Sequence, residues 1–187
     1  MDHPERLAPG GLVFLGLMSP ERPLIPPTLA TLAPGYPPMS REWPRSVVDR
    51  DAPDFVTRAN KGRLDLSREG GLFGDDREFL VAVEVHEGED DWWWARVRLA
   101  EPWDIMGAGS ASALGSGFGA PEFAMLSTSG EVIVCGTTGE SSIGTVLVNG
   151  FEDLAGLREL ADWKAGWPGT QQQERAAARR WLESTRH

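Results

Sequence analysis

Cysteine and histidine are scarce in this sequence. The single cysteine, Cys135, cannot form an intramolecular disulfide, and such a composition is typical of a reducing compartment. His3 and His187 lie close to the chain ends, so we expect only His86 to be fixed by the fold. A transition-metal site needs several such ligands at a defined spacing, and no such spacing occurs. The sequence therefore predicts no metal site and no cofactor.

Long hydrophobic runs are also missing. The longest strongly apolar run is Gly11–Met18, whereas a helix that spans a bilayer needs about 20 apolar residues. The first residues include Asp2, Pro4 and Glu5 instead of the basic region of a signal peptide. We therefore expect a cytoplasmic protein with no membrane partner.

Cationic residues are absent from a long central stretch. The chain has a net charge of −10, and no Lys or Arg lies between Arg98 and Arg158. Residues 61–107 carry 12 acidic and 6 basic side chains, a net charge of −6. Such a stretch offers little to a phosphate backbone, which disfavours duplex nucleic acid as a partner.

Familiar catalytic motifs are missing too. No Gly-x-Ser-x-Gly nucleophile motif occurs. The spacing Gly115-x-Gly117-x-x-Ala120 matches the dinucleotide fingerprint, but Pro121 and a predicted strand follow it instead of the required helix. Cys135 falls within a predicted strand, where a buried and inert thiol is the ordinary case. Nucleophilic catalysis and nucleotide binding are therefore disfavoured.

The most distinctive feature present is three consecutive tryptophans, residues 92–94, in the second arm of a predicted hairpin. We expect Val85 to pair with Trp93 and Glu84 with Trp94, with Glu84 diagonal to Arg96. Strand alternation then places Trp93 on the valine-rich core face, and Trp92 and Trp94 on the opposite face. Either the Pro-rich segment or a C-terminal helix covers this pair, or the pair is exposed to a partner.

Further elements follow from hydrophobic periodicity and turn residues. A short helix over Pro53–Ala59, a short strand over Arg63–Ser67 and a low-complexity loop over Gly107–Ala120 are expected. Three more strands and two helices are predicted: Phe123–Ser127, Glu131–Gly136, Gly144–Val148, Phe151–Lys164 and Gln171–Thr185. Asn149 with Glu152, and Thr170 with Gln173, have the spacing of helix-capping pairs.

These elements predict an α+β fold. We expect a mainly antiparallel, twisted sheet of about five or six strands, with both C-terminal helices on one side. Eleven of the 14 prolines lie in the first 53 residues, which predicts an irregular N-terminal segment wrapped on the core. We treat residues 1–187 as a single domain. Its parts are a Pro-rich wrapping segment (1–53), a sheet-forming region (54–150) and the C-terminal helices (151–187).

For function, the hypothesis is a non-catalytic protein-interaction module, such as an inhibitor or immunity-type partner of a basic protein. An acidic hairpin tip beside aromatic side chains provides charge for steering and rings for anchoring. The predicted partner-binding residues are Trp92, Trp94, Glu87, Glu89, Asp90 and Asp91.

Two alternatives stay open. One is a small enzyme or ligand-binding protein with a Trp-lined pocket, in which Glu84, His86 and Asp104 carry proton transfer. This alternative requires the three side chains to converge on one cavity. The other is single-stranded nucleic-acid binding, with bases stacked on exposed tryptophans beside Arg96 and Arg98. Nothing in the sequence specifies the oligomeric state.

Overall fold

A computed structural model describes residues 2–39, 42–86, 91–101 and 103–185 of the chain. Its centre is a seven-stranded sheet in the order β1-β4-β3-β7-β8-β9-β2, and all neighbouring strands are antiparallel. The α+β prediction is confirmed, with slightly more strands than expected. The sheet strands are β1 (Leu12–Leu17), β2 (Arg45–Asp49), β3 (Glu78–Glu84), β4 (Trp92–Leu99), β7 (Ala124–Leu126), β8 (Val132–Thr138) and β9 (Ser142–Asn149).

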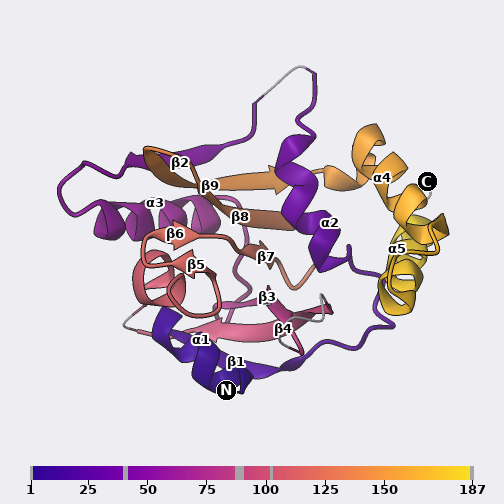
Figure 1. Cartoon of the computed structure of the whole chain (residues 1–187), viewed down its shortest axis with the longest axis horizontal. Helices are drawn as coiled ribbons and strands as arrows, with labels where there is room; N and C mark the ends of the chain where they lie inside the picture. Colours follow the sequence, from indigo (N-terminus) through magenta and orange to yellow (C-terminus); the bar gives the residue numbers. More distant parts are fainter. Residues whose placement is uncertain (1, 40–41, 87–90, 102, 186–187) are drawn as a thin grey trace.

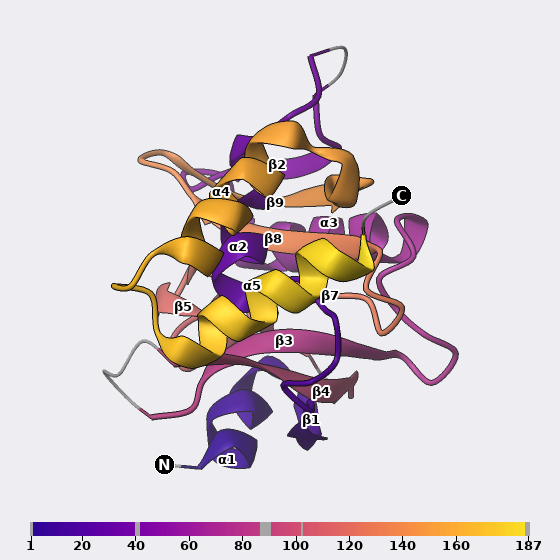
Figure 2. The ribbon, with the colours of Figure 1, turned by 90° about the vertical axis from the view of Figure 1, so that its right-hand side faces the viewer.

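Helices cover both faces of this sheet, as Figures 1 and 2 show. The α-helices are α1 (His3–Leu7), α2 (Pro27–Leu32), α3 (Phe55–Glu69), α4 (Ala155–Gly166) and α5 (Gln172–Ser184). Helix α3 packs on one face, here called the α3 face, and α2, α4 and α5 cover the other, here called the α5 face. Within the described residues, no helix has both the length and the apolar character needed to cross a membrane.

Two hydrophobic cores result from this layering. In β3, Phe79, Val81 and Val83 belong to the core under α3, whereas Leu80 and Ala82 belong to the core under α5. Because a strand covered on both faces buries consecutive side chains, β3 reads as an unbroken apolar run. The two C-terminal helices lie on one side of the sheet, as the periodicity predicted.

The Pro-rich segment between β1 and β2, in its described residues 18–39 and 42–44, is here called the strap. Since β1 and β2 are the two outermost strands, the strap connects opposite edges of the sheet, about 29 Å apart at the usual strand spacing. It crosses the α5 face, where it forms α2 and buries Ile25 and Leu29. Proline interrupts regular structure here, and the apolar residues between the prolines hold the strap on the core.

The Trp-containing hairpin forms, but its register differs from the prediction by two residues. Val83 pairs with Trp93, Ala82 with Trp94 and Glu84 with Trp92. A shift of two keeps the side-chain parity, so the division into two faces is retained in β3 and in β4 from Trp94 onward. The expected Glu84–Arg96 diagonal is wrong, because Arg96 Nε instead donates to Glu78 Oε2 at 2.7 Å.

Two segments fold differently from the sequence-based expectation. The predicted helix before Ala59 and strand over Arg63–Ser67 form the single helix α3, because residues 59, 60, 63, 64 and 67 are buried at helical spacing. The expected Gly-rich loop contains part of a π-helical turn, η3 (Ile105–Gly109), and a small hairpin of β5 (Gly115–Gly117) and β6 (Ala120–Pro121).

The predicted capping pairs are wrong. Helix α4 begins at Ala155 after a short 3₁₀ turn, η4 (Phe151–Asp153), and its N-cap residue is Leu154. Helix α5 has Gln171 at its N-cap, with no side-chain cap bond. In both cases the helix starts without a side-chain capping bond.

Candidate functional site: the tryptophan groove

The three consecutive tryptophans have three different environments. Trp92 is 38% exposed, Trp93 is half-buried and Trp94 is only 5% exposed. The prediction that Trp93 is a core residue is wrong: it pairs with Val83, one pair before the end of the β3–β4 ladder, and lines a surface groove together with Trp94.

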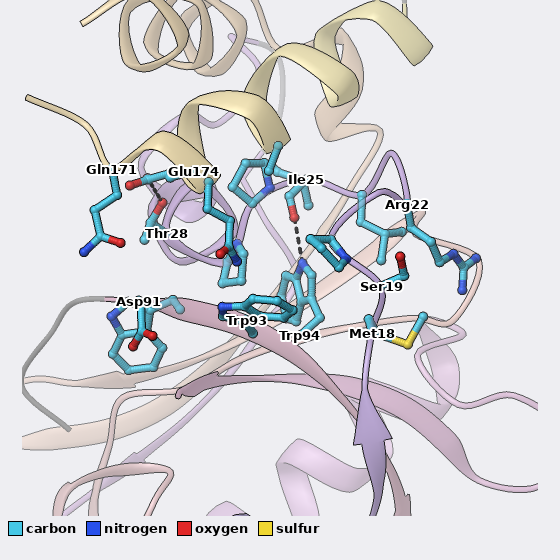
Figure 3. Close-up of a pocket in the computed structure, with 17 residues that line it drawn as sticks. Met18, Ser19, Arg22, Ile25, Thr28, Asp91, Trp93, Trp94, Gln171 and Glu174 are labelled. Atoms are coloured by element: carbon cyan, nitrogen blue, oxygen red, sulfur yellow. Dashed lines mark hydrogen bonds between the residues drawn. The ribbon is translucent and has the colours of Figure 1, made fainter. Parts of the chain in front are cut away.

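Trp94 joins the sheet to the strap. Its indole Nε1 donates a hydrogen bond of 2.7 Å to the backbone carbonyl of Ile25 (Figure 3). Ile25 is 1% exposed and belongs to the same core as Trp94. The indole therefore fills apolar space with its rings and satisfies a buried carbonyl with its N–H. Burial of this tryptophan under the Pro-rich segment is one of the alternatives that the sequence left open.

The groove lies between the strap, the start of β4 and the N-terminal end of α5 (Figure 3). It is narrow, about 60 Å³ in volume, and its surface is mostly apolar. Rings of tryptophan and proline form much of the lining, so little side-chain conformational entropy is lost when a ligand occupies the groove. The lining residues are Met18, Ser19, Pro20, Arg22, Leu24, Ile25, Pro26, Pro27, Thr28, Asp91, Trp92, Trp93, Trp94, Gln171, Gln173, Glu174 and Ala177.

A polar cluster closes one end of the groove. Lys164 Nζ lies 2.6 Å from Glu174 Oε1, and the Thr28 hydroxyl donates to the same carboxylate oxygen. These residues come from α4, α5 and α2, so one carboxylate ties three helices together. Both charged side chains are only 18% exposed, which shields the pair from solvent screening.

Asp91 adds a second carboxylate at this end. Its oxygens accept hydrogen bonds from the His86 backbone N–H at 2.9 Å and pair with His86 Nδ1 at 2.5 Å. Desolvation opposes ionisation, but the His86 hydrogen bonds and charge outweigh it, so the pKa of Asp91 lies below its ordinary value of 3.8. Asp91 is therefore an anion at neutral pH. The other predicted tip residues, Glu87, Glu89 and Asp90, lie outside the described residues.

The three candidate acid–base residues do not share a cavity. Asp104 caps η3: its carboxylate accepts from Asn60 Nδ2 at 2.6 Å and from the backbone N–H groups of Gly107 and Ala108. Glu84 and His86 belong to the hairpin end of β3, whereas Asp104 follows the opposite end of β4. Glu84 lines a small hollow next to Leu7, and Asp104 lines a different one next to Trp103.

Sequence reasoning located the tryptophans and missed the walls of the groove. The strap gave a partial signal, because apolar residues between its prolines indicated a wrapped segment. No signal in the sequence marked Gln171, Gln173 and Glu174 as groove residues, since their role follows from where α5 lies on the sheet.

Comparisons with known protein families, with curated proteins and with solved structures found no match for this chain. In the part of the chain that the structure describes, no cluster of His, Cys, Asp and Glu is arranged to hold a metal ion.

Proposed function

We propose that this chain is a non-catalytic protein-interaction module whose tryptophan groove receives an extended segment of a partner protein. The observation that carries the proposal is the groove itself, a narrow apolar channel with Trp93 and Trp94 in its lining and polar groups around it. Rigid aromatic pockets of this kind are where binding energy concentrates in protein interfaces.

The charges near the groove support a basic partner, as an inhibitor or immunity-type protein would have. Asp91 and Glu174 both line the groove; Glu174 is paired with Lys164, and Asp91 is paired with His86, which is charged only when protonated. The chain as a whole carries a net charge of −10. Long-range attraction of this sign accelerates encounter with a cationic surface and weakens as salt is added.

The small-ligand alternative also has one observation in its favour, because the groove is apolar with a few converging polar groups. The separation of Glu84, His86 and Asp104 removes the geometric support for acid–base catalysis by this set. A screen of metabolites by thermal shift separates the two functions: a ligand that occupies the groove raises the Tm of the wild type and leaves that of a Trp93→Ala variant unchanged.

The main test is quantitative capture of partner proteins from a lysate of the source cells. The wild type is compared with Trp93→Ala in the groove and with Trp167→Ala, a matched control at an exposed tryptophan after α4 that does not line it. We expect a partner that is retained by wild type and the control, is lost by at least tenfold with Trp93→Ala, and is eluted by salt. Equal retention by all three proteins contradicts the proposal.

A further inference from the structure

The tryptophan groove does not end at the strap. Met18 and Arg22 line its end opposite Gln171 and Asp91 (Figure 3), and the same two residues line a second hollow beyond it. This second hollow is wider, about 320 Å³, and its surface is mostly polar. We call it the acidic hollow, because Asp75, Asp76 and Glu78 line it. The two depressions therefore form one path across the α5 face.

The acidic hollow carries charge that the chain does not neutralise internally. Glu78 is paired with Arg96, whose Nε donates to it at 2.7 Å. Asp75 and Asp76 are exposed in the turn before β3, and neither forms an ion pair with any residue that the structure describes. Their carboxylates are free to meet a cation from outside, whereas the Glu78–Arg96 pair is already satisfied.

Strand β4 sets the distance between the two depressions. Trp94 lines the groove and Arg96 lines the acidic hollow, two residues apart on the same face of the strand. Two residues of extended chain span about 7 Å. Asp75 and Asp76 lie further out, in the turn before β3. A bound peptide in extended form would reach from one depression to the other within two to four residues, or about 7–13 Å.

Arg22 stands where the two depressions meet, and its positive charge opposes a cation there. A cationic side chain is therefore best placed beyond Arg22, over Asp75 and Asp76. An anionic side chain would meet Arg22 but would be repelled on either side, by Asp91 in the groove and by the two aspartates in the hollow, whereas the charge of Glu174 is balanced by Lys164. The charge pattern selects a basic residue at one end of the path.

We propose that the partner segment has an apolar or aromatic residue two to four positions away from a lysine or arginine, an inference that rests on the proposed function. The apolar residue occupies the tryptophan groove, and the cation occupies the acidic hollow. The groove supplies most of the affinity, since exposed charge pairs contribute little individually. The acidic hollow supplies specificity, because it favours apolar segments that carry a nearby cation over those that do not.

The test is selection of nine-residue peptides from a random display library on the full chain, followed by synthesis of the enriched peptides. Each peptide is also made in an uncharged form, with citrulline in place of arginine or acetyl-lysine in place of lysine. Affinities are measured for wild type, Trp93→Ala, the double variant Asp75→Asn with Asp76→Asn, and Arg22→Gln. A double variant at two exposed carboxylates outside both depressions, Asp51→Asn with Asp153→Asn, controls for net charge.

We expect enriched peptides to pair an apolar with a basic residue. Their affinity should fall about three- to tenfold in the Asp75/Asp76 variant, stay unchanged in the charge-matched control and rise with Arg22→Gln. Peptides that need Trp93 but bind equally well in the uncharged form overturn this inference and leave the proposed function standing. If no peptide depends on Trp93, the proposed function fails and this inference with it.

Discussion

Replacing Trp94 by phenylalanine tests whether one indole holds the strap on the sheet. The change removes the N–H that donates to the Ile25 carbonyl at 2.7 Å and leaves that carbonyl without this donor. Loss of a buried hydrogen bond costs about 1–2 kcal/mol. The smaller ring loses about 1 kcal/mol more in apolar contact, because the site is only 5% exposed and packed by the strap. We therefore expect the free energy of unfolding to fall by about 2–3 kcal/mol.

Urea denaturation followed by circular dichroism measures this loss, and amide hydrogen exchange measures where it acts. Protection should fall first at residues around Ile25, while β8 and β9, which pair with each other along their length, keep theirs. Trp92→Phe is the matched control: its side chain is 38% exposed, so a change below about 0.5 kcal/mol is expected. A loss in Trp94→Phe no larger than in the control, with unchanged exchange around Ile25, would refute the anchoring role.

Three further predictions concern buried charge and titration. Burial raises the pKa of the Cys135 thiol from 9.0 to about 12. The contribution of this thiol to stability is therefore fully present below pH 9, and above pH 9 it is lost at about 1.4 kcal/mol per pH unit. In guanidinium denaturation at pH 9–10.5, the free energy of unfolding of Cys135→Ala should depend less on pH than that of the wild type. Burial also lowers the pKa of Arg63 from 12.5 to about 10, which means that its charged form destabilises the folded state at neutral pH. The Arg63 guanidinium has no hydrogen-bond partner among the described residues. Arg63→Met should therefore raise the free energy of unfolding by about 1–3 kcal/mol, even though the contact with the Trp103 ring is lost. A destabilised variant contradicts this prediction. Lys164→Met should lower the free energy of unfolding by about 1–2 kcal/mol, and with it the Tm, because it leaves the Glu174 carboxylate partly buried and without Lys164. Adding Glu174→Gln should recover part of this loss. If the losses of the two single variants add up in the double variant, the two side chains are not coupled.

The fold class and the central hairpins could be predicted because their signals are local. The turn between β7 and β8 contains Gly130, whose φ of 85° favours glycine. Alternating apolar residues mark the strands on either side of this turn. Edge strands β1 and β2 were not predicted, since their partners β4 and β9 lie far away in the chain. Helix α3 was divided in two because five residues around Leu64 also fit an alternating pattern.

The candidate site could be predicted only in part, for a similar reason. Three tryptophans in one strand necessarily place aromatic rings on both faces, and this directed attention to the right strand. Whether each ring is covered depends on where the strap and α5 pack. Trp93 shows the limit: strand alternation assigned it to the valine-rich core face, yet it is half-buried and lines the groove together with Trp94, next to neighbours that the hairpin alone does not specify.

The position of β1 and β2 at opposite edges also bears on how the molecule is made. Both strands are synthesised before their partners: β1 must wait for β4 and β2 must wait for β9, roughly 80 and 100 residues later. Such long-range pairings slow folding, and they leave the uncharged β1 segment unpaired on a growing chain. The groove also requires α5, near the end of the described chain. Binding competence is therefore acquired only after the residues of α5 that line the groove have left the ribosome.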